Sequence, residues 1–277
     1  MSIWTRLFQH NNYRGRSTFA NLYYQNNPAT YARISKGWLD AVSLHDSVSS
    51  LETGASSWEQ GGNVILFQDS GFRGRYTMFP ATPGSTVRTP NLSSENFNDR
   101  MSSGLLVRRF SRELPPIALG DMGSPPLRQQ IGDLASSIPR LSKRGNPVIT
   151  WDMWPGFSPS YNYIYVRVPV RVDVPSWFDY DAEIRLWLYL YVDGAGKVRG
   201  HVAWYGAWVE GGWKTGSIMD RLMDGIPGRI GDVNSRISDA LSSLQALKFV
   251  KLYYLPGKAN HVGHVNDDVS IVLVKQV

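Results

Sequence analysis

Two short segments of the chain carry the residue types that bind a hard metal ion. Residues 45–50 read His-Asp-Ser-Val-Ser-Ser, and residues 98–103 read Asn-Asp-Arg-Met-Ser-Ser. Carboxylate, hydroxyl and main-chain carbonyl oxygens are the ligands that calcium prefers. Few carboxylates per site imply weak binding, with a dissociation constant on the order of 10⁻⁵–10⁻³ M. A single segment of this kind is typical of an ordinary polar turn, whereas two copies favour at least one calcium site.

Each segment follows a second element that is also repeated. Residues 8–15 read Phe-Gln-His-Asn-Asn-Tyr-Arg-Gly, and residues 67–74 read Phe-Gln-Asp-Ser-Gly-Phe-Arg-Gly. Two aromatic residues that flank a polar turn, with a glycine after them, are typical of a β-hairpin folded over onto its own sheet, one ring beside the other. Because both elements recur in the same order, the chain contains an internal repeat. We expect two four-stranded units that form a Greek-key sandwich.

With both repeated elements in place, residues 1–110 resemble a microbial βγ-crystallin domain. That family combines the same aromatic corner with a loop of the pattern [Asn/Asp]-[Asn/Asp]-x-x-[Ser/Thr]-Ser. The resemblance implies an all-β Greek-key sandwich with calcium sites, each built from both loops and completed by main-chain carbonyls and water. The side-chain ligands that it implies are the oxygens of Asp46, Ser49, Asp99 and Ser102.

The two loops fit the family pattern unequally. The loop that begins at Asn98 matches it at every defined position, whereas the first loop has His45 where Asn or Asp is usual. An imidazole cannot replace a hard oxygen ligand. If this position contributes only its main-chain carbonyl, the change is harmless.

Length and composition limit the class of protein. The chain has 277 residues, enough for two domains. No cysteine is present, which excludes disulfides and thiolate metal sites. No apolar run approaches the roughly 18 residues of a membrane span, and the first residues lack the apolar core of a signal peptide. We therefore expect a soluble protein made in the cytoplasm, unless it is released by a leaderless route. The net charge of +6 includes no dense Lys/Arg block, so we expect no specific nucleic-acid binding.

Prolines and glycines between residues 111 and 125 predict a linker between two domains. Beyond it, apolar residues recur at spacings of three and four within 127–141 and 226–244, which predicts two helices. Pro139 lies inside the first pattern and predicts that this helix ends early. We expect residues 126–277 to form an α+β domain.

Strict alternation of apolar and polar or aromatic residues predicts three unusually long strands, about twice the common length. One face of these strands is aliphatic, and the other carries Tyr, Trp and Arg. The expected architecture is a long-stranded, curved antiparallel sheet packed on two helices. Pro169 predicts that its strand lies at an edge or is bulged there. The expected strands are residues 163–174, 182–193 and 197–209, with shorter closing strands at 248–255 and 270–275.

The aromatic residues of the second domain leave two roles open. Seven of the ten Trp lie beyond residue 150. A Trp/Tyr-rich sheet face can stack on the sugars of a glycan or lie at the interface of a lipid membrane. The same rings can equally pack in a core or form the contacts of a homo-oligomer.

No catalytic motif is present in the sequence. Glu183, Asp193 and Glu210 are acids on the predicted sheet, but no spacing pairs them. His261 and His264 lie near two aspartates and could bind a metal, although such a cluster is more often a polar surface loop.

Three functional hypotheses follow. The first is a non-catalytic, calcium-binding, two-domain protein of the bacterial effector, toxin or adhesion type, whose second domain engages a membrane, lipid or glycan. The second is a hydrolase with its active site in the second domain and the crystallin-like domain as an accessory. The third is a structural or stress protein.

Overall fold

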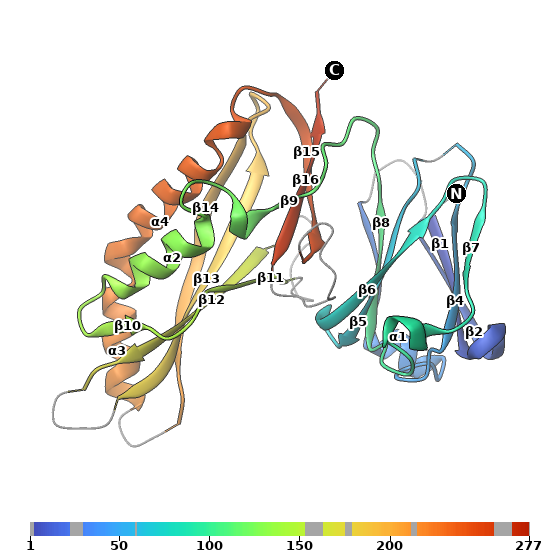
Figure 1. Ribbon diagram of the computed structural model, residues 1–277, viewed down its shortest axis with the longest axis horizontal. Coiled ribbons are helices and arrows are strands. Elements are labelled where there is room, and N and C mark those ends of the chain that lie inside the picture. Colours follow the sequence, from blue (N-terminus) through green and yellow to red (C-terminus); the bar gives the residue numbers. More distant parts are fainter. Residues whose placement is uncertain are drawn as a thin grey trace. The chain divides into compact units, whose positions relative to one another are not determined.

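The computed structural model describes residues 3–22, 30–58, 60–152, 163–174, 179–211, 215–257 and 268–276. The chain divides into two compact units, and the second begins at Leu114. The secondary structure is mostly β-strand, with a few helices (Figure 1). Within the described ranges, no helix is long and apolar enough to cross a membrane.

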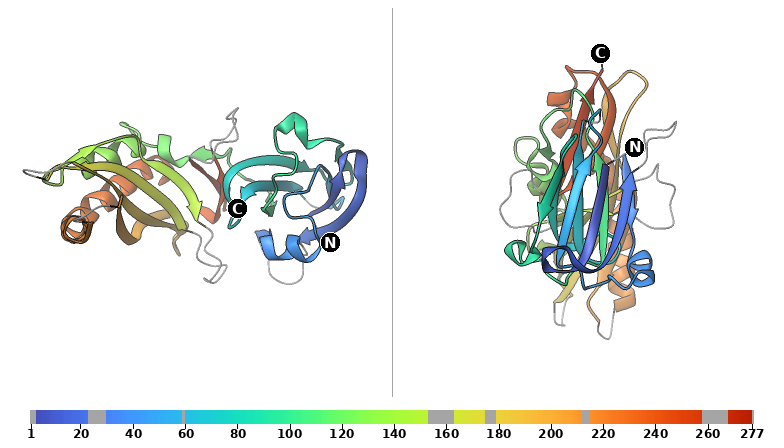
Figure 2. Two further views of the ribbon diagram at one scale, coloured as in Figure 1. Left: turned by 90° about the horizontal axis from the view of Figure 1, so that it is seen from below. Right: turned by 90° about the vertical axis from the view of Figure 1, so that its right-hand side faces the viewer.

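The first unit consists of two four-stranded antiparallel sheets, ordered β2-β1-β4-β7 and β3-β8-β5-β6, which face each other (Figure 2). The first repeat supplies β1 to β4 and the second supplies β5 to β8. The third strand of each repeat lies in the sheet of the other repeat, since β3 pairs with β8 and β7 pairs with β4. This exchange joins the two repeats into one Greek-key sandwich. The strands are β1 (Ile3–His10), β2 (Arg14–Leu22), β3 (Tyr31–Ile34), β4 (Ser50–Ala55), β5 (Gly62–Asp69), β6 (Arg73–Ala81), β7 (Thr86–Thr89) and β8 (Ser103–Arg108), with the helix α1 (Lys36–Ala41) and the 3-10 helices η1 (Asn11–Tyr13) and η2 (Leu92–Glu95) between them.

The core of the first unit lies between its two sheets. Ile3 and Leu7 from one sheet and Leu66 and Leu106 from the other are fully buried. Side chains alternate between the two faces of a strand, so the inward residues of both sheets form one apolar layer. Burial of each such side chain contributes roughly 1.5–3 kcal/mol before conformational entropy is counted.

The two aromatic corners have the predicted packing. The rings of Phe8 and Tyr13 meet edge to face at 5.5 Å, and those of Phe67 and Phe72 do so at 6.0 Å. Gly74, which follows the second pair, has a φ of +74°, and a Cβ there would lie 2.5 Å from a carboxylate oxygen of β5. The sequence prediction of a hairpin folded over its own sheet is therefore confirmed for both corners.

The second unit contains a five-stranded sheet and a separate three-stranded sheet, all of whose pairings are antiparallel (Figure 2). The larger sheet is ordered β10-β12-β13-β14, and β11 also pairs with β12. The smaller sheet is ordered β15-β16-β9. The elements of the second unit are β9 (Ile117–Ala118), η3 (Leu119–Asp121), α2 (Leu127–Ser136), β10 (Leu141–Lys143), β11 (Val148–Asp152), β12 (Tyr163–Val172), β13 (Tyr180–Val192), β14 (Val198–Val209), α3 (Thr215–Gly225), α4 (Pro227–Ala240), η4 (Ser242–Leu244), β15 (Phe249–Pro256) and β16 (Val269–Lys275).

This arrangement differs from the expected single sheet on two helices. The closing strands β15 and β16 form their own sheet, because β16 pairs with the two-residue strand β9 rather than with the long strands. A third helix, α3, precedes α4 and buries only Ile218 and Leu222. So short an apolar pattern is not distinctive in a sequence. The helix α2 ends at Ser136, before Pro139, as predicted.

The segment predicted as a linker, residues 111–125, is in large part packed into the second unit. The Leu114 N–H donates to the Leu273 carbonyl at 2.8 Å. Ile117 pairs with Ile271 in the small sheet. Its prolines and glycines therefore punctuate a packed segment and do not form a free connection between the units.

Pro169 was predicted to lie on an edge strand or at a bulge, but its strand β12 has partners on both sides and pairs with β13 through Pro169 without a register shift. Along one side of β12, β11 ends its pairing at Arg167 and β10 begins at Val170. The Pro169 carbonyl accepts a hydrogen bond from the Arg144 N–H at 3.1 Å on that side. In an antiparallel sheet the N–H and C=O of one residue point toward the same neighbouring strand. The N–H that proline lacks would therefore point to the side where the pairing of β12 changes from β11 to β10, so no ladder hydrogen bond is lost there.

A buried ion pair joins the beginning and the end of the second unit. The Arg128 Nη2 donates to the Asp268 Oδ2 at 2.7 Å, and the Asp268 side chain is fully buried. The same carboxylate accepts the N–H groups of Gly120 at 3.2 Å and of Val269 at 2.8 Å. Burial raises the pKa of Asp268, and these hydrogen bonds and the guanidinium oppose the increase. The pair links α2, η3 and β16 across 140 residues of sequence.

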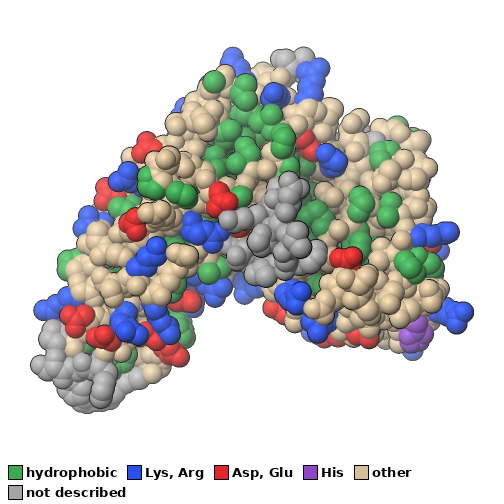
Figure 3. Space-filling view, viewed as in Figure 1, with side chains coloured by type: hydrophobic (Ala, Val, Ile, Leu, Met, Phe, Trp, Pro, Cys, Tyr) green, Lys and Arg blue, Asp and Glu red, His purple; other side chains and the backbone are tan. Residues whose placement is uncertain are grey.

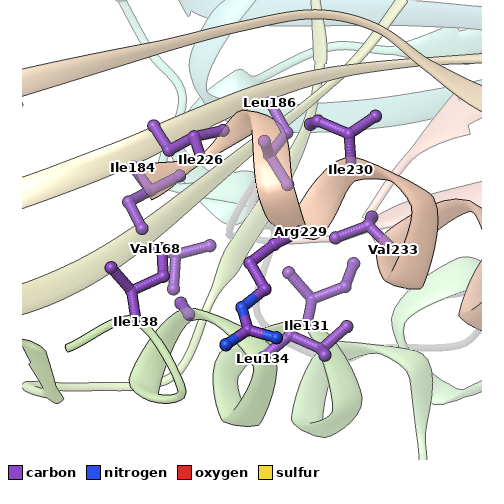
Figure 4. A pocket seen from close by; sticks show the side chains of 11 residues that line it. Ile131, Leu134, Ile138, Val168, Ile184, Leu186, Ile226, Arg229, Ile230 and Val233 are labelled. Atoms are coloured by element: carbon purple, nitrogen blue, oxygen red, sulfur yellow. The ribbon is translucent and has the colours of Figure 1, made fainter. Parts of the chain in front are cut away.

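Helices cover one face of the five-stranded sheet (Figure 1). Between α2, α4 and this inner face lies an apolar gap of about 20 Å³, which Figure 4 shows with its lining residues. Arg229 reaches from α4 toward α2 and donates to the Ser137 carbonyl at 3.2 Å. A gap of this size has room for about one water molecule and none for an acyl chain.

Candidate calcium site

The two segments predicted as calcium loops lie side by side. Residues 45–50 lead into β4 and residues 98–103 into β8, and these strands belong to different sheets. The Asp46 N–H donates to the Met101 carbonyl at 3.0 Å, and the Asp99 N–H donates to the Val48 carbonyl at 3.1 Å. Two equivalent bonds, one in each direction, therefore join the loops through their backbones.

The last serine of each loop holds the aromatic corner of its own repeat. The Ser50 hydroxyl accepts the Tyr13 N–H at 3.1 Å and donates to the His10 carbonyl at 2.6 Å. Ser103 bonds equivalently in the second repeat, to the Phe72 N–H at 3.0 Å and to a main-chain carbonyl at 2.7 Å. The sequence shows both elements, but only the structure shows that this serine connects them.

The aspartate of each loop meets a serine of the other. The Ser102 Oγ donates to the Asp46 Oδ1 at 2.9 Å, and the Ser49 Oγ donates to the Asp99 Oδ1 at 2.8 Å. Calcium ligands lie at about 2.3–2.6 Å from the ion, so two oxygens this close together can both bind one ion placed beside them. The loops thus present two related oxygen pairs, each drawn from both loops.

The backbone presents these aspartates to solvent. Asp46 has a φ of +49° and Asp99 a φ of +52°, a left-handed conformation that aspartate adopts more readily than most residues. The Asp46 side chain is 51% exposed, whereas Ser49 and Ser102 are buried. An ion can therefore reach each pair from the solvent side, where the carboxylates lie, with the hydroxyls recessed behind them.

Further oxygens lie beside Asp99. The Asn98 Nδ2 donates to the Asp99 Oδ2 at 2.7 Å, and the Asn98 Oδ1 is buried and accepts no hydrogen bond from the described part of the chain. The Ser49 hydroxyl also lies 2.8 Å from the main-chain carbonyl of Gln9, a position that the loop pattern in the sequence does not indicate. A buried acceptor without a donor is costly. The amide nitrogen faces Asp99, so Asn98 would have to turn its oxygen toward that carboxylate to join the ligands of a calcium ion.

His45 lies against the other oxygen pair. Its Nε2 is 3.1 Å from the Ser102 Oγ and 3.3 Å from the Asp46 Oδ2, and its Nδ1 is 3.4 Å from the Asp40 Oδ1. The imidazole therefore occupies space beside both oxygens that a calcium ion would need. A calcium ion bound at this pair would have to displace the ring.

The other candidate ligands form no comparable site. Across the described residues, no group of three or more His, Cys, Asp or Glu side chains is placed to hold a metal. His261, His264 and Asp267 lie outside the described residues, and Asp268 is committed to Arg128. A calcium site in the first unit thus depends on hydroxyls, carbonyls and water as well as on its carboxylates.

The acids named from the sequence lie in two places in the fold. Glu183 and Asp193 are ten residues apart along β13 and the turn that follows it, about 33 Å by strand rise. Glu210 lies opposite Asp181 and is therefore diagonal to Glu183 across β13 and β14. The hydrogen bond from the Lys197 N–H, followed by the Arg199 guanidinium, holds the pKa of Asp193 below its usual value. Asp193 therefore caps the β13–β14 turn and cannot act with Glu183 as an acid–base pair.

Comparisons with known proteins give one distant likeness. No protein-family model matches the chain, and neither does any curated protein. Among solved structures, the NMR structure of spherulin 3A from Physarum polycephalum is similar, with 20% sequence identity and a TM-score of 0.28. The match covers 40% of this chain and 99% of that one. A likeness of this degree says nothing about what the chain binds.

Proposed function

We propose that the first unit is a calcium-binding module of the βγ-crystallin type. The observation that carries the proposal is the pair of Asp–Ser contacts across the loops, Asp46 with Ser102 and Asp99 with Ser49. Each places a carboxylate and a hydroxyl oxygen within reach of one hard cation. Calcium there would offset the charge of two exposed aspartates and bridge the loops that lead into β4 and β8.

The whole chain is then a non-catalytic, two-domain protein of the effector, toxin or adhesion type. Its second unit would engage a membrane, lipid or glycan through the aromatic face of the five-stranded sheet. The separation of Glu183 from Asp193 weighs against a hydrolase that pairs these two acids, because glycoside hydrolysis needs two carboxyl groups within about 5–9.5 Å. Glu210, diagonal to Glu183 across β13 and β14, is the acid that the hydrolase alternative would pair with it.

Calcium is expected to raise the thermal midpoint of the full chain by several degrees. With dissociation constants of about 20–200 µM, about 2 mM calcium stabilises the folded state by about 1.4–2.7 kcal/mol per site. The measurement is thermal unfolding in calcium against EGTA. Magnesium at the same concentration serves as a control and should shift the midpoint less, because it demands a tighter octahedral site. Equal midpoints in calcium and EGTA would contradict the proposal.

Replacing His45 with Asn is expected to tighten calcium binding at the Asp46–Ser102 pair by about tenfold, which corresponds to about 1.4 kcal/mol. The substitution removes the ring that lies 3.1 Å from the Ser102 Oγ and supplies a carbonyl oxygen in its place. A calcium titration of both proteins measures the change. His10→Asn, at an exposed histidine of the same unit, is the matched control and should leave the affinity unchanged. Unchanged or weaker binding in His45→Asn would show that the ring does not compete with the ion.

A further inference from the structure

The five-stranded sheet of the second unit has an outer face opposite its helices (Figure 1). Ile184 and Leu186 of β13 point to α2 and α4 and line the apolar gap between them. Their neighbours in the strand, Glu183, Arg185 and Trp187, therefore lie on the opposite face. No described helix packs on that outer face, so its side chains are the ones available to a ligand.

Aromatic rings form a continuous layer along the outer face. Strand register places Trp187 opposite Trp204, and rings from β12, β13 and β14 meet above the sheet. The ring pairs and their centroid distances are Tyr163–Trp204 and Tyr165–Trp187 at 4.9 Å, Tyr189–Tyr191 at 5.5 Å and Tyr163–Tyr189 at 6.0 Å. These mutual contacts hold the rings in place, so a ligand meets a preformed aromatic surface.

Three of the aromatic side chains on this face are open to solvent. Trp204 is 42% exposed, Trp208 is 40% exposed and Tyr191 is 37% exposed. The two tryptophans are four residues apart on β14, which is about 13 Å by strand rise. The Arg185 guanidinium lies 5.7 Å from the centroid of the Trp208 ring. Glu183 of β13 lies directly opposite Trp208 in the strand register. Hydrogen-bonding groups thus lie next to an exposed ring.

The charges on this face are paired with one another. Five arginines form ion pairs with three carboxylates of this face. The pairs are Arg185–Glu183 at 3.2 Å, Arg167–Glu183 at 3.9 Å, Arg171–Asp181 at 3.7 Å, Arg144–Asp181 at 2.8 Å and Arg199–Asp193 at 2.9 Å. A fourth carboxylate, that of Glu210, lies opposite Asp181 in register. The face is therefore rich in hydrogen-bonding groups but close to neutral.

We infer that this outer face binds a neutral polysaccharide, with the rings of Trp204, Trp208 and Tyr191 stacked on sugar rings. The inference rests on the proposed function, in which the second unit engages an external ligand, and it commits that ligand to one class. The C–H groups of a sugar carry partial positive charge and fit the negative face of an aromatic ring. The planar groups of Arg185 and Glu183 lie where they can bond sugar hydroxyls.

Charge is what favours a glycan over the other ligands of aromatic surfaces. Proteins that bind single-stranded nucleic acid combine aromatic rings, on which the bases stack, with a positively charged groove. The arginines of this face are instead paired with carboxylates. A membrane interface would have to remove Glu183 and its partners from water, which is costly. On the side of the molecule that Figure 3 shows, Lys and Arg are likewise interspersed with Asp and Glu. A neutral chain of hydroxyl groups requires no net charge from its partner.

The test is binding of the full chain to insoluble cellulose, chitin and starch, by depletion from solution. Vesicles of phosphatidylcholine and phosphatidylglycerol and a single-stranded oligothymidine are assayed beside them. Wild type is expected to bind at least one polysaccharide, and the apparent dissociation constant is expected to rise about tenfold in Trp208→Ala and about a hundredfold in Trp204→Ala/Trp208→Ala. Trp58→Ala is the matched control, because Trp58 is 65% exposed and belongs to the other unit. It should bind as wild type does.

Three outcomes overturn the inference: no binding to any of the polysaccharides, binding only to vesicles or oligonucleotide, and undiminished binding by folded Trp208→Ala. Among the described residues no ring stacks on Trp208, so its loss tests the surface even if Trp204→Ala disturbs the packing on Tyr163. Calcium binding is measured on the same samples. A protein that binds calcium but no polysaccharide refutes this inference alone, and one that binds polysaccharide but no calcium refutes only the calcium proposal.

Discussion

Replacing Asp268 with Ala is expected to lower the free energy of unfolding by about 3–5 kcal/mol, because it leaves the Arg128 guanidinium without its buried partner. Arg128 is only 17% exposed, and the same carboxylate accepts two backbone N–H groups. The loss is measured by urea unfolding of the full chain, followed by tryptophan fluorescence.

Two further variants separate the ion pair from a general loss of packing. Asp232→Ala, whose carboxylate is 53% exposed and lies 3.5 Å from Arg229, is the surface control and should change stability little. Arg128→Met combined with Asp268→Ala is expected to cost less than Asp268→Ala alone, since no charge is left buried. A loss below about 1 kcal/mol in Asp268→Ala would mean that water reaches the guanidinium and replaces the carboxylate.

The double substitution Asp46→Ala/Asp99→Ala is expected to abolish the calcium-dependent rise of the thermal midpoint. It removes the carboxylate from both oxygen pairs and leaves only hydroxyl and carbonyl oxygens, which bind calcium poorly without a charged ligand. The difference between midpoints in calcium and in EGTA is the quantity to measure. Both positions have positive φ, so alanine strains the backbone equally with and without calcium, and this strain cancels in the difference.

Glu52→Ala in the same unit is the control for the double variant. Its carboxylate pairs with Arg88 at 3.0 Å and, in the part of the chain that the structure describes, makes no hydrogen bond or ion pair with the loops, so it should retain the full calcium-dependent shift. A double variant that still responds to calcium would place the ion elsewhere.

Features encoded over a few residues could be predicted from the sequence. The corner at Phe67 and Phe72 depends on two rings, a tight turn and Gly74, all within eight residues, and the structure has it as expected. The long strands β12, β13 and β14 follow from alternation that continues over ten or more residues. In each case the pattern that makes the element is local and repeated.

Features that depend on distant pairing could not be predicted. The exchange of β3 and β7 between sheets, and the pairing of Ile117 with Ile271, join segments that no local pattern connects. A two-residue strand such as β9 has no periodicity at all. Its place in a Pro/Gly-rich segment therefore predicts a linker, although the backbone there packs against β16.

The candidate site divides in the same way. Asp46, Ser49, Asp99 and Ser102 were predicted as ligands because their residue types recur in order. The contact of His45 with Ser102 depends on how one side chain turns across the loops, and no sequence pattern reports that. The bonds from Ser50 and Ser103 to the corners were also not predicted, although their spacing is part of the repeat.

Calorimetric titration of calcium into the metal-free full chain would measure binding at the two oxygen pairs directly. We expect saturable binding with a dissociation constant on the order of 10⁻⁵–10⁻³ M, tighter at the Asp99–Ser49 pair than at the Asp46–Ser102 pair, where His45 lies against the oxygens. Asp99→Ala should remove the tighter phase, and His45→Asn should strengthen the weaker one. Absence of saturable binding up to about ten times the upper dissociation constant, or binding that Asp99→Ala leaves unchanged, would exclude a calcium site between these loops.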